Sequence, residues 1–292
     1  MADTRGQQDI FGLDIDKLAK GFGEQTYNFI NEVTKNKMKG DSIRWFQKTA
    51  GTLSIASPGA SSNVSPGAQP DQKEVSWTRN TSYKRTFFVE GTLDDEDVED
   101  AEIDTFATTV RDLTEMIVRD RDAHLWDIMS EGQSPSEIQT FATTAIGGDQ
   151  WDAASAAANI VLDLQHAKKL IQDEGYNPEG ASVLMDTLAM RSVVDWLITG
   201  KGSSIPGFSS DKVKSGTVVQ LLNLNLKVSL NVTTDHVLVL VPKRAVTYSE
   251  SKGITATTTV NDQINRKIRI KTSGVAYRTD PKAIVLITDI NT

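Results

Sequence analysis

Few residues in the chain could support catalysis or metal binding. The three histidines are His124, His166 and His236, and no two of them have a zinc-ligand spacing such as i,i+4. We interpret them as structural or surface residues. The acidic run from Asp94 to Glu102 lacks the D-x-D-x-D-G pattern of a calcium loop and lies where a helix is expected to begin. A helix start or a solvated charged surface is therefore favoured over a metal site.

Nucleophiles and phosphate-binding loops are also poorly represented. The chain has no cysteine, hence no thiolate nucleophile, thiolate metal site or disulfide, and it has no G-x-S-x-G motif. The Gly200-Lys201 pair is not a phosphate loop, because Asp195 stands where a glycine is expected and Gly202 replaces the serine or threonine. We predict that the protein is not an enzyme and has no cofactor. A soluble hydrolase stays open as an alternative, since the 39 acidic residues always offer carboxylate pairs.

The charge balance and hydropathy restrict the classes of partner. The formal net charge of -8 argues against tight, sequence-independent binding to nucleic acid, which depends on phosphate neutralisation by clustered Lys and Arg. The N-terminus lacks the apolar segment of a signal peptide, and no run approaches the roughly 18 apolar residues of a membrane span. We expect no membrane partner.

The first third of the sequence contains few residues that could form a core of their own. Residues 1–48 are polar and interrupted by glycine, which predicts an arm that needs a surface to lie on. A long hairpin follows, with one side at 49–56, a proline-rich and glycine-rich tip at 57–72, and a returning side at 73–91 with the two-residue period of a strand. At about 3.3 Å per residue this hairpin reaches roughly 60 Å, so it is expected to project from its own body.

The middle of the chain is mainly helical. One apolar stripe with a spacing of three and four predicts a very long helix over 93–132. A second helix is predicted over 151–174, followed by a short buried strand at 181–185 and a third helix at 187–198. A glycine-rich and serine-rich loop is expected at 199–210.

The last third is mostly strand. Alternation of apolar and polar residues predicts a half-buried strand over 222–232, and 237–241 is a short buried strand. Near the end, Ile268 and Ile270 alternate with basic residues, and 283–287 is a further apolar strand. No repeat is evident.

Two groups of residues on these strands are candidates for contact with another chain. Aromatic residues on a hairpin that leaves its own core suggest a contact that is buried by a partner. The basic residues of the strand near 266–271 are equally consistent with a solvated strand face and with pairing to a neighbour's acids.

The order of these parts resembles the major capsid proteins of tailed viruses of bacteria and archaea, which have the Hong Kong 97 fold. The likeness covers nearly the whole chain. Residues 153–196, with a helix, a G-Y-N-P turn, a VLM strand and a second helix, look like the axial domain of that family. The segments VLVLVPKRAV and KAIVLITDI look like its terminal strands.

The resemblance implies an α+β fold with five parts. These are an N-terminal arm at 1–48, an extended loop at 49–92, a peripheral domain with a spine helix at 93–150, an axial domain at 151–250, and returning strands of the peripheral domain at 251–292. The tip at 57–72 is then laid on an adjacent subunit, and contacts between chains offset an ordering cost of roughly 16 to 30 kcal/mol. The predicted contact residues are Pro58, Pro66, Pro70, Trp77, Tyr83, Arg85, Phe87, Phe88, Lys267, Arg269 and Lys271.

The function implied by this resemblance is structural. Copies are expected to form hexamers and pentamers of an icosahedral virion head, assembled in the host cytoplasm, which encloses double-stranded DNA without sequence-specific binding. The acidic balance would keep the DNA from sticking to the wall. Portal, scaffolding and decoration proteins are candidate partners, and scaffolding is expected to be a separate protein because Met1 is retained. The alternative within the same fold is an encapsulin compartment that encloses cargo enzymes.

Overall fold

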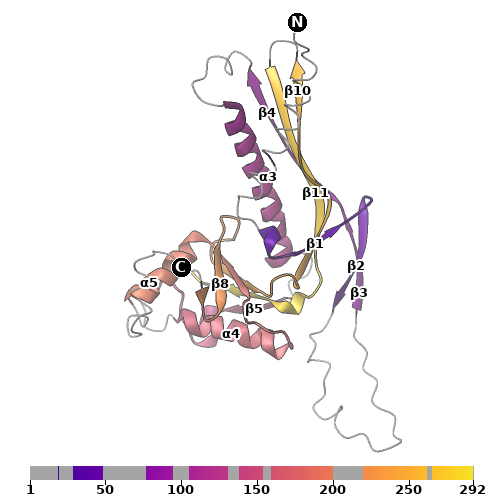
Figure 1. Ribbon diagram of the computed structural model, residues 1–292. Coiled ribbons are helices and arrows are strands. Elements are labelled where there is room, and N and C mark those ends of the chain that lie inside the picture. The colour runs from indigo at the N-terminus through magenta and orange to yellow at the C-terminus, as the bar shows by residue number, and fades with distance from the viewer. Residues whose placement is uncertain are drawn as a thin grey trace, which may run out of the picture.

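The computed structural model describes residue 19 and residues 29–48, 77–94, 105–130, 138–153, 159–199, 220–261 and 265–291. The molecule is elongated (Figure 1): a long helix lies along a group of long strands, a mixed helical and stranded body lies at one end, and a short hairpin stands to the side.

The long part is a four-stranded sheet covered by one helix. The strand order is β1 (Thr34–Lys37), β10 (Val246–Asn261), β11 (Asn265–Arg278) and β4 (Arg85–Asp94). β1 runs parallel to β10, whereas the other two pairs are antiparallel. Helix α3 (Thr105–Ser130) packs on one face of the sheet through an apolar cluster. The buried members of that cluster are Ala19, Val110, Leu113, Ile117, Ile268 and Ile270.

Two glycines allow close packing within this layer. A Cβ at Gly91 on β4 would lie 2.9 Å from Cδ1 of the buried Leu113, so the glycine lets α3 approach the strand. Gly274 on β11 lies under the fully buried Tyr248 ring, and a Cβ there would also lie 2.9 Å from the carbonyl oxygen of Ser249. Gly274 has no room for a side chain, whereas at Gly91 a side chain would require the terminal methyl group of Leu113 to shift.

The body is a six-stranded sheet whose strands come from distant parts of the chain. The order is β5 (Gln139–Ala142), β12 (Ile284–Thr288), β9 (His236–Leu240), β6 (Ser182–Met185), β8 (Leu224–Val228) and β7 (Gln220–Leu221). Helices α4 (Ile160–Asp173) and α5 (Thr187–Thr199) contribute to its core, and so does the C-terminal half of α3 through Leu125, Trp126 and Met129. Short 3-10 helices occur at η3 (Thr143–Ile146) and η5 (Pro281–Ala283).

The segment around the 3-10 helix η1 (Phe29–Asn31) is held on the body. Phe29, Ile30 and Val33 lie in the same core, so this part of the predicted arm rests on the body. The buried Glu32 carboxylate accepts hydrogen bonds from Ser182 Oγ and Lys227 Nζ, and its backbone oxygen accepts from Lys243 N at 2.7 Å. Burial of this carboxylate is offset by these partners.

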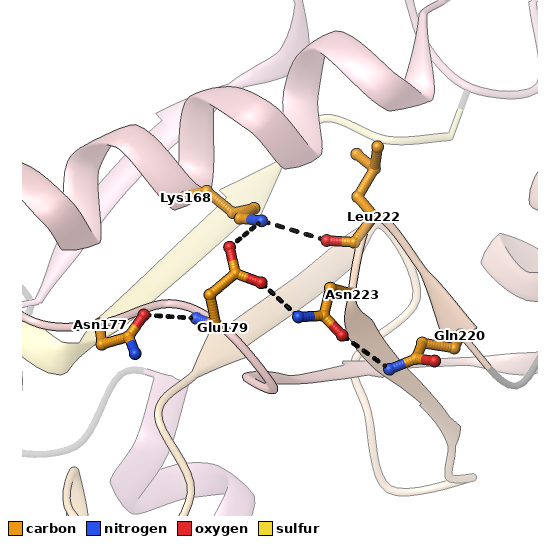
Figure 2. Close-up of polar contacts among 6 residues, drawn as sticks. All are labelled: Lys168, Asn177, Glu179, Gln220, Leu222 and Asn223. Carbon is orange, nitrogen blue, oxygen red and sulfur yellow. Dashed lines mark hydrogen bonds and ion pairs between the residues drawn. The ribbon is translucent and has the colours of Figure 1, made fainter.

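A polar network fixes the turn between β7 and β8 to helix α4 (Figure 2). Leu222 and Asn223 both have left-handed backbone conformations, with φ of 54° and 62°, which a two-residue hairpin turn requires. Lys168 Nζ donates to the Leu222 carbonyl at 3.1 Å and to Glu179 Oε1 at 2.9 Å. Asn223 Nδ2 donates to the other oxygen of Glu179, and Gln220 Nε2 donates to Asn223 Oδ1 at 3.1 Å. Asn177 Oδ1 accepts from the Glu179 N–H at 3.0 Å.

The side hairpin consists of β2 (Ser42–Lys48) and β3 (Trp77–Tyr83), paired antiparallel. One face packs on the long sheet, because Trp45 stacks on Tyr277 of β11 with ring centroids 5.0 Å apart. The chain passes from β3 into β4 at Lys84, whose ammonium lies 2.6 Å from Asp41 Oδ1. The returning side predicted at 73–91 is therefore two strands in two sheets.

Several predicted element boundaries are wrong. The helix predicted over 93–132 is described as α3, which begins at Thr105, because β4 continues through Asp94 by pairing with β11. The helix predicted from 151 begins at Ile160, where the Asn159 side chain accepts a hydrogen bond from Leu162 N. The strand predicted over 222–232 is only β8, since Leu222 and Asn223 form the hairpin turn.

The predicted domain boundaries also differ from the sheet topology. β2 lies within the range assigned to the arm, although it forms the first strand of the hairpin with β3. β5 and β12 lie in ranges assigned to the peripheral domain, but both belong to the six-stranded sheet, where they pair with each other. Pairing between strands that are far apart in sequence leaves no local signal from which these assignments could be read.

Candidate subunit interface

The outer face of the β2–β3 hairpin is aromatic and exposed. Trp77 is 53% exposed and Tyr83 is 77% exposed, as predicted for contact residues that the chain itself does not cover. Phe46 on β2 is 55% exposed and shares this face, because it pairs with Arg79, which lies between Trp77 and Tyr83. Phe46 was missed, although the alternation of β2 places it opposite the buried Trp45.

The edge strand β4 carries the remaining aromatic candidates. Phe88 is 68% exposed, whereas Phe87 points toward α3 and lies with its ring 5.9 Å from that of His124. Arg85 donates to His124 Nδ1 at 3.0 Å, and its guanidinium lies 5.8 Å from the centre of the Phe87 ring. Phe87 and Arg85 are thus engaged within the chain, unlike Phe88.

The electrostatics around His124 favour a neutral ring. Burial lowers the pKa of His124, and the neighbouring Arg85 charge lowers it further, while Asp127 acts in the opposite direction. A neutral ring can accept the hydrogen bond from Arg85. His166 instead packs its ring against the edge of Phe141, with centroids 4.7 Å apart.

The basic residues of β11 lie on the sheet face opposite α3. Ile268 and Ile270 are fully buried under α3, so Lys267, Arg269 and Lys271 point to the other side. Their neighbours on β4 are Thr92, Glu90 and Phe88, in that order. Arg269 Nε donates to Glu90 Oε2 at 2.8 Å, and its NH2 group also donates to that oxygen. Arg269 therefore has a partner in its own chain.

Part of the predicted interface cannot be placed. Pro58, Pro66 and Pro70, with the whole tip at 57–72, lie outside the described residues. The acidic run is likewise outside them, apart from Asp94.

Within the described ranges, no centre for metal chemistry is formed. No group of three or more His, Cys, Asp or Glu residues in this part of the chain could hold a metal ion. None of the helices described is both long enough and apolar enough to cross a membrane. The features that stand out are therefore surfaces.

The combination of a long helix, a long sheet, a mixed body and a side hairpin also occurs in solved structures of other chains. No protein-family model matches the sequence, and no curated protein matches it. Solved structures match over nearly the whole chain. The virus-like particle of Pyrococcus furiosus is 9% identical with a TM-score of 0.64, and the match covers 95% of this chain and 99% of that one.

Structures of capsids also match this chain over about nine tenths of its length. The capsid protein of cyanophage P-SCSP1u is 13% identical with a TM-score of 0.64, and the match covers 92% of this chain and 90% of that one. A capsid chain of a native GTA particle is 10% identical with a TM-score of 0.65, and 89% of each chain is covered. The α+β capsid fold expected from the order of parts is confirmed.

Proposed function

We propose that this protein is the structural subunit of a closed shell, built from many copies that contact one another through the side hairpin and the long sheet. The observation that carries this proposal is a fold shared over about nine tenths of the chain with proteins of capsids and particles. The surfaces give it a physical basis.

The exposed aromatic face is the first of these surfaces. Phe46, Trp77 and Tyr83 lie together on the outer side of a two-stranded sheet whose inner side already packs on the long sheet. An isolated two-stranded hairpin is marginal in water, and large aromatic residues bury 150–250 Å² each when they are covered. A second copy that covers this face stabilises both the hairpin and the assembly.

A more specific proposal follows from the resemblance to the major capsid proteins of tailed viruses. Copies form hexamers and pentamers of an icosahedral virion head, assembled in the host cytoplasm, that encloses double-stranded DNA. The net charge of -8 is consistent with a shell that encloses DNA without sequence-specific binding, because an acidic wall repels the DNA phosphates. Pro58, Pro66, Pro70 and the residues around them then lie on an adjacent subunit, and portal, scaffolding and decoration proteins are further partners.

A compartment of the encapsulin type, which encloses cargo enzymes, is the second candidate. It would have the same fold as the virion head and would differ in what the shell encloses. The content of particles isolated from their natural source separates the two candidates. Nuclease-protected double-stranded DNA supports the virion head, and a co-purifying protein cargo without DNA supports the compartment.

Assembly itself is tested with purified protein by light scattering and negative-stain microscopy. We expect closed shells or rings from the unaltered chain and none from Trp77→Ser/Tyr83→Ser, which should stay folded by circular dichroism. Leu162→Ser on α4, where Leu162 is 41% exposed, is the matched control and should assemble normally. A compact monomer of the unaltered chain at high concentration would contradict the proposed function. Shells of normal yield from the double variant would contradict the role of the aromatic face.

A further inference from the structure

A groove between β4 and α3 carries two acidic side chains for which the structure gives no ion pair. The groove has a volume of about 580 Å³. Asp120 and Asp127 line one wall, and Ala123 lies between them on the same helix. Both aspartates are exposed, and they are one heptad apart, which places them on one side of α3 about 10 Å from each other.

The cationic groups near this groove do not neutralise the two acids. Arg85 lines the opposite wall, but its guanidinium is held on the His124 ring and the face of Phe87. Burial and the Arg85 charge lower the pKa of His124, which disfavours a charged ring that could pair with Asp127. No salt bridge to Asp120 or Asp127 occurs among the described residues.

The outer face of the sheet has the opposite charge and a similar spacing. Lys267 and Lys271 form no ion pair within the described part of the chain, whereas Arg269 between them is paired with Glu90. Four residues of strand separate the two lysines by about 13 Å on one face. On both surfaces the position between the two charged residues carries no net charge. It is the Arg269–Glu90 ion pair on the sheet and the small Ala123 on the helix.

We propose that Lys267 and Lys271 of one copy bind Asp120 and Asp127 of the next copy. This inference rests on the proposed function and names the receiving surface for the basic face. Because the donor and acceptor surfaces differ, the contact is heterologous: each copy uses its sheet face on one neighbour and its groove on the other. Contact of two basic faces would place like charges together, which disfavours a two-fold arrangement.

Charge reversal tests the pairing. Lys267→Glu/Lys271→Glu and Asp120→Lys/Asp127→Lys should each raise the critical concentration for assembly about tenfold or more, and the chain that combines all four changes should return to near the original value. Lys169→Glu/Asp173→Lys on α4 exchanges the same charges elsewhere and should have no effect. Lys267→Gln/Lys271→Gln is a milder variant for the case that the glutamates impair folding, and it should cause a smaller rise.

Mixing the two single-face variants tests the contact without requiring closed shells. In this mixture the unaltered lysines of one variant can bind the unaltered aspartates of the other. Sedimentation should therefore show that the two variants associate with each other at concentrations where neither associates alone. The proposal is overturned if both double variants are folded and assemble normally, or if the combined variant does not recover. It is also overturned if reversal of the lysines only lowers the content of nucleic acid. Absence of shells from the unaltered chain, together with association in the mixture, would instead contradict the proposed function alone.

Discussion

Asp122 shows how a single buried residue makes the stability of the fold depend on pH. Its Oδ2 accepts the backbone N–H of Phe29 at 3.0 Å, while its Oδ1 is buried without a hydrogen-bond partner. Burial raises the pKa of Asp122 to about 7, although Arg121 and the Phe29 N–H act in the opposite direction. The protonated form is thus favoured in the folded chain. The stability that this group contributes is present below about pH 4 and is lost as the pH rises through about 7.

The substitution Asp122→Asn removes this dependence while keeping an acceptor for the Phe29 N–H. At pH 8 we expect a free energy of unfolding higher than that of the unaltered chain by on the order of 1–3 kcal/mol, and a smaller difference at pH 5. Urea denaturation of the unassembled subunit at the two pH values measures both quantities. Asp173→Asn, at an exposed position on α4, is the control. An equal difference at pH 5 and pH 8 would show that ionisation of Asp122 is not the cause.

The packing of strand β10 on strand β11 requires a residue without a side chain at Gly274. Gly274→Ala would place a Cβ against the Tyr248 ring and 2.9 Å from the Ser249 carbonyl oxygen, and the backbone cannot yield easily there. We expect a loss of about 2 kcal/mol or more in the free energy of unfolding. Gly253→Ala on β10 is the matched control, because its nearest neighbour would be Glu250 Oε1 at an ordinary 3.6 Å. Thermal unfolding of both variants decides the question, and equal midpoints would contradict the packing described.

Elements with a clear local period were predictable from the sequence. Strand β6 and helix α5 lie where the sequence placed them, and β11 shows the predicted alternation of buried isoleucines and basic residues. The turn at Leu222 and Asn223 was missed because a two-residue turn continues the alternation of the strands on either side. Strand β2 was missed because its partner β3 lies about 30 residues away, and adjacent aromatic residues obscure its period.

The candidate interface was only partly predictable for a related reason. The exposure of Trp77 and Tyr83 follows from their place on the side hairpin, whereas Phe88, predicted on the same hairpin, is exposed on the edge strand β4. The pairing of Arg269 with Glu90 depends on the register of β11 and β4, which the sequence does not encode locally. In the sequence, nothing distinguishes Asp120 and Asp127 from other polar residues on a solvated helix face. Only the fold shows that they line a groove.

The whole molecule is divided into a well-covered body and a thinly covered extension (Figure 1). The largest apolar cluster joins the six-stranded sheet, α4, α5, the C-terminal half of α3 and the near ends of β10 and β11, while a much smaller cluster lies between α3 and the rest of the long strands. The outer face of the long sheet carries Lys267, Arg269 and Lys271 toward one end, and the side hairpin packs on Val275 and Tyr277 toward the other. Local stability follows the amount of buried apolar surface, so the two parts should open independently in a free subunit.

Hydrogen exchange should therefore distinguish the free subunit from the assembled shell. In the free subunit we expect the amides of β6 and β9 to exchange slowly, and those of β3, β4 and the Lys267–Lys271 segment of β11 to exchange much faster. Assembly should slow exchange in the second group, because neighbouring copies cover the hairpin and the outer face of the sheet, and it should leave β6 and β9 unchanged. Mass spectrometry of the two states measures this, with β9 as the internal reference. Equal protection of β3 and β4 in both states would mean that these strands are already stable in a single copy, and the argument that the extension is completed by other subunits would not hold.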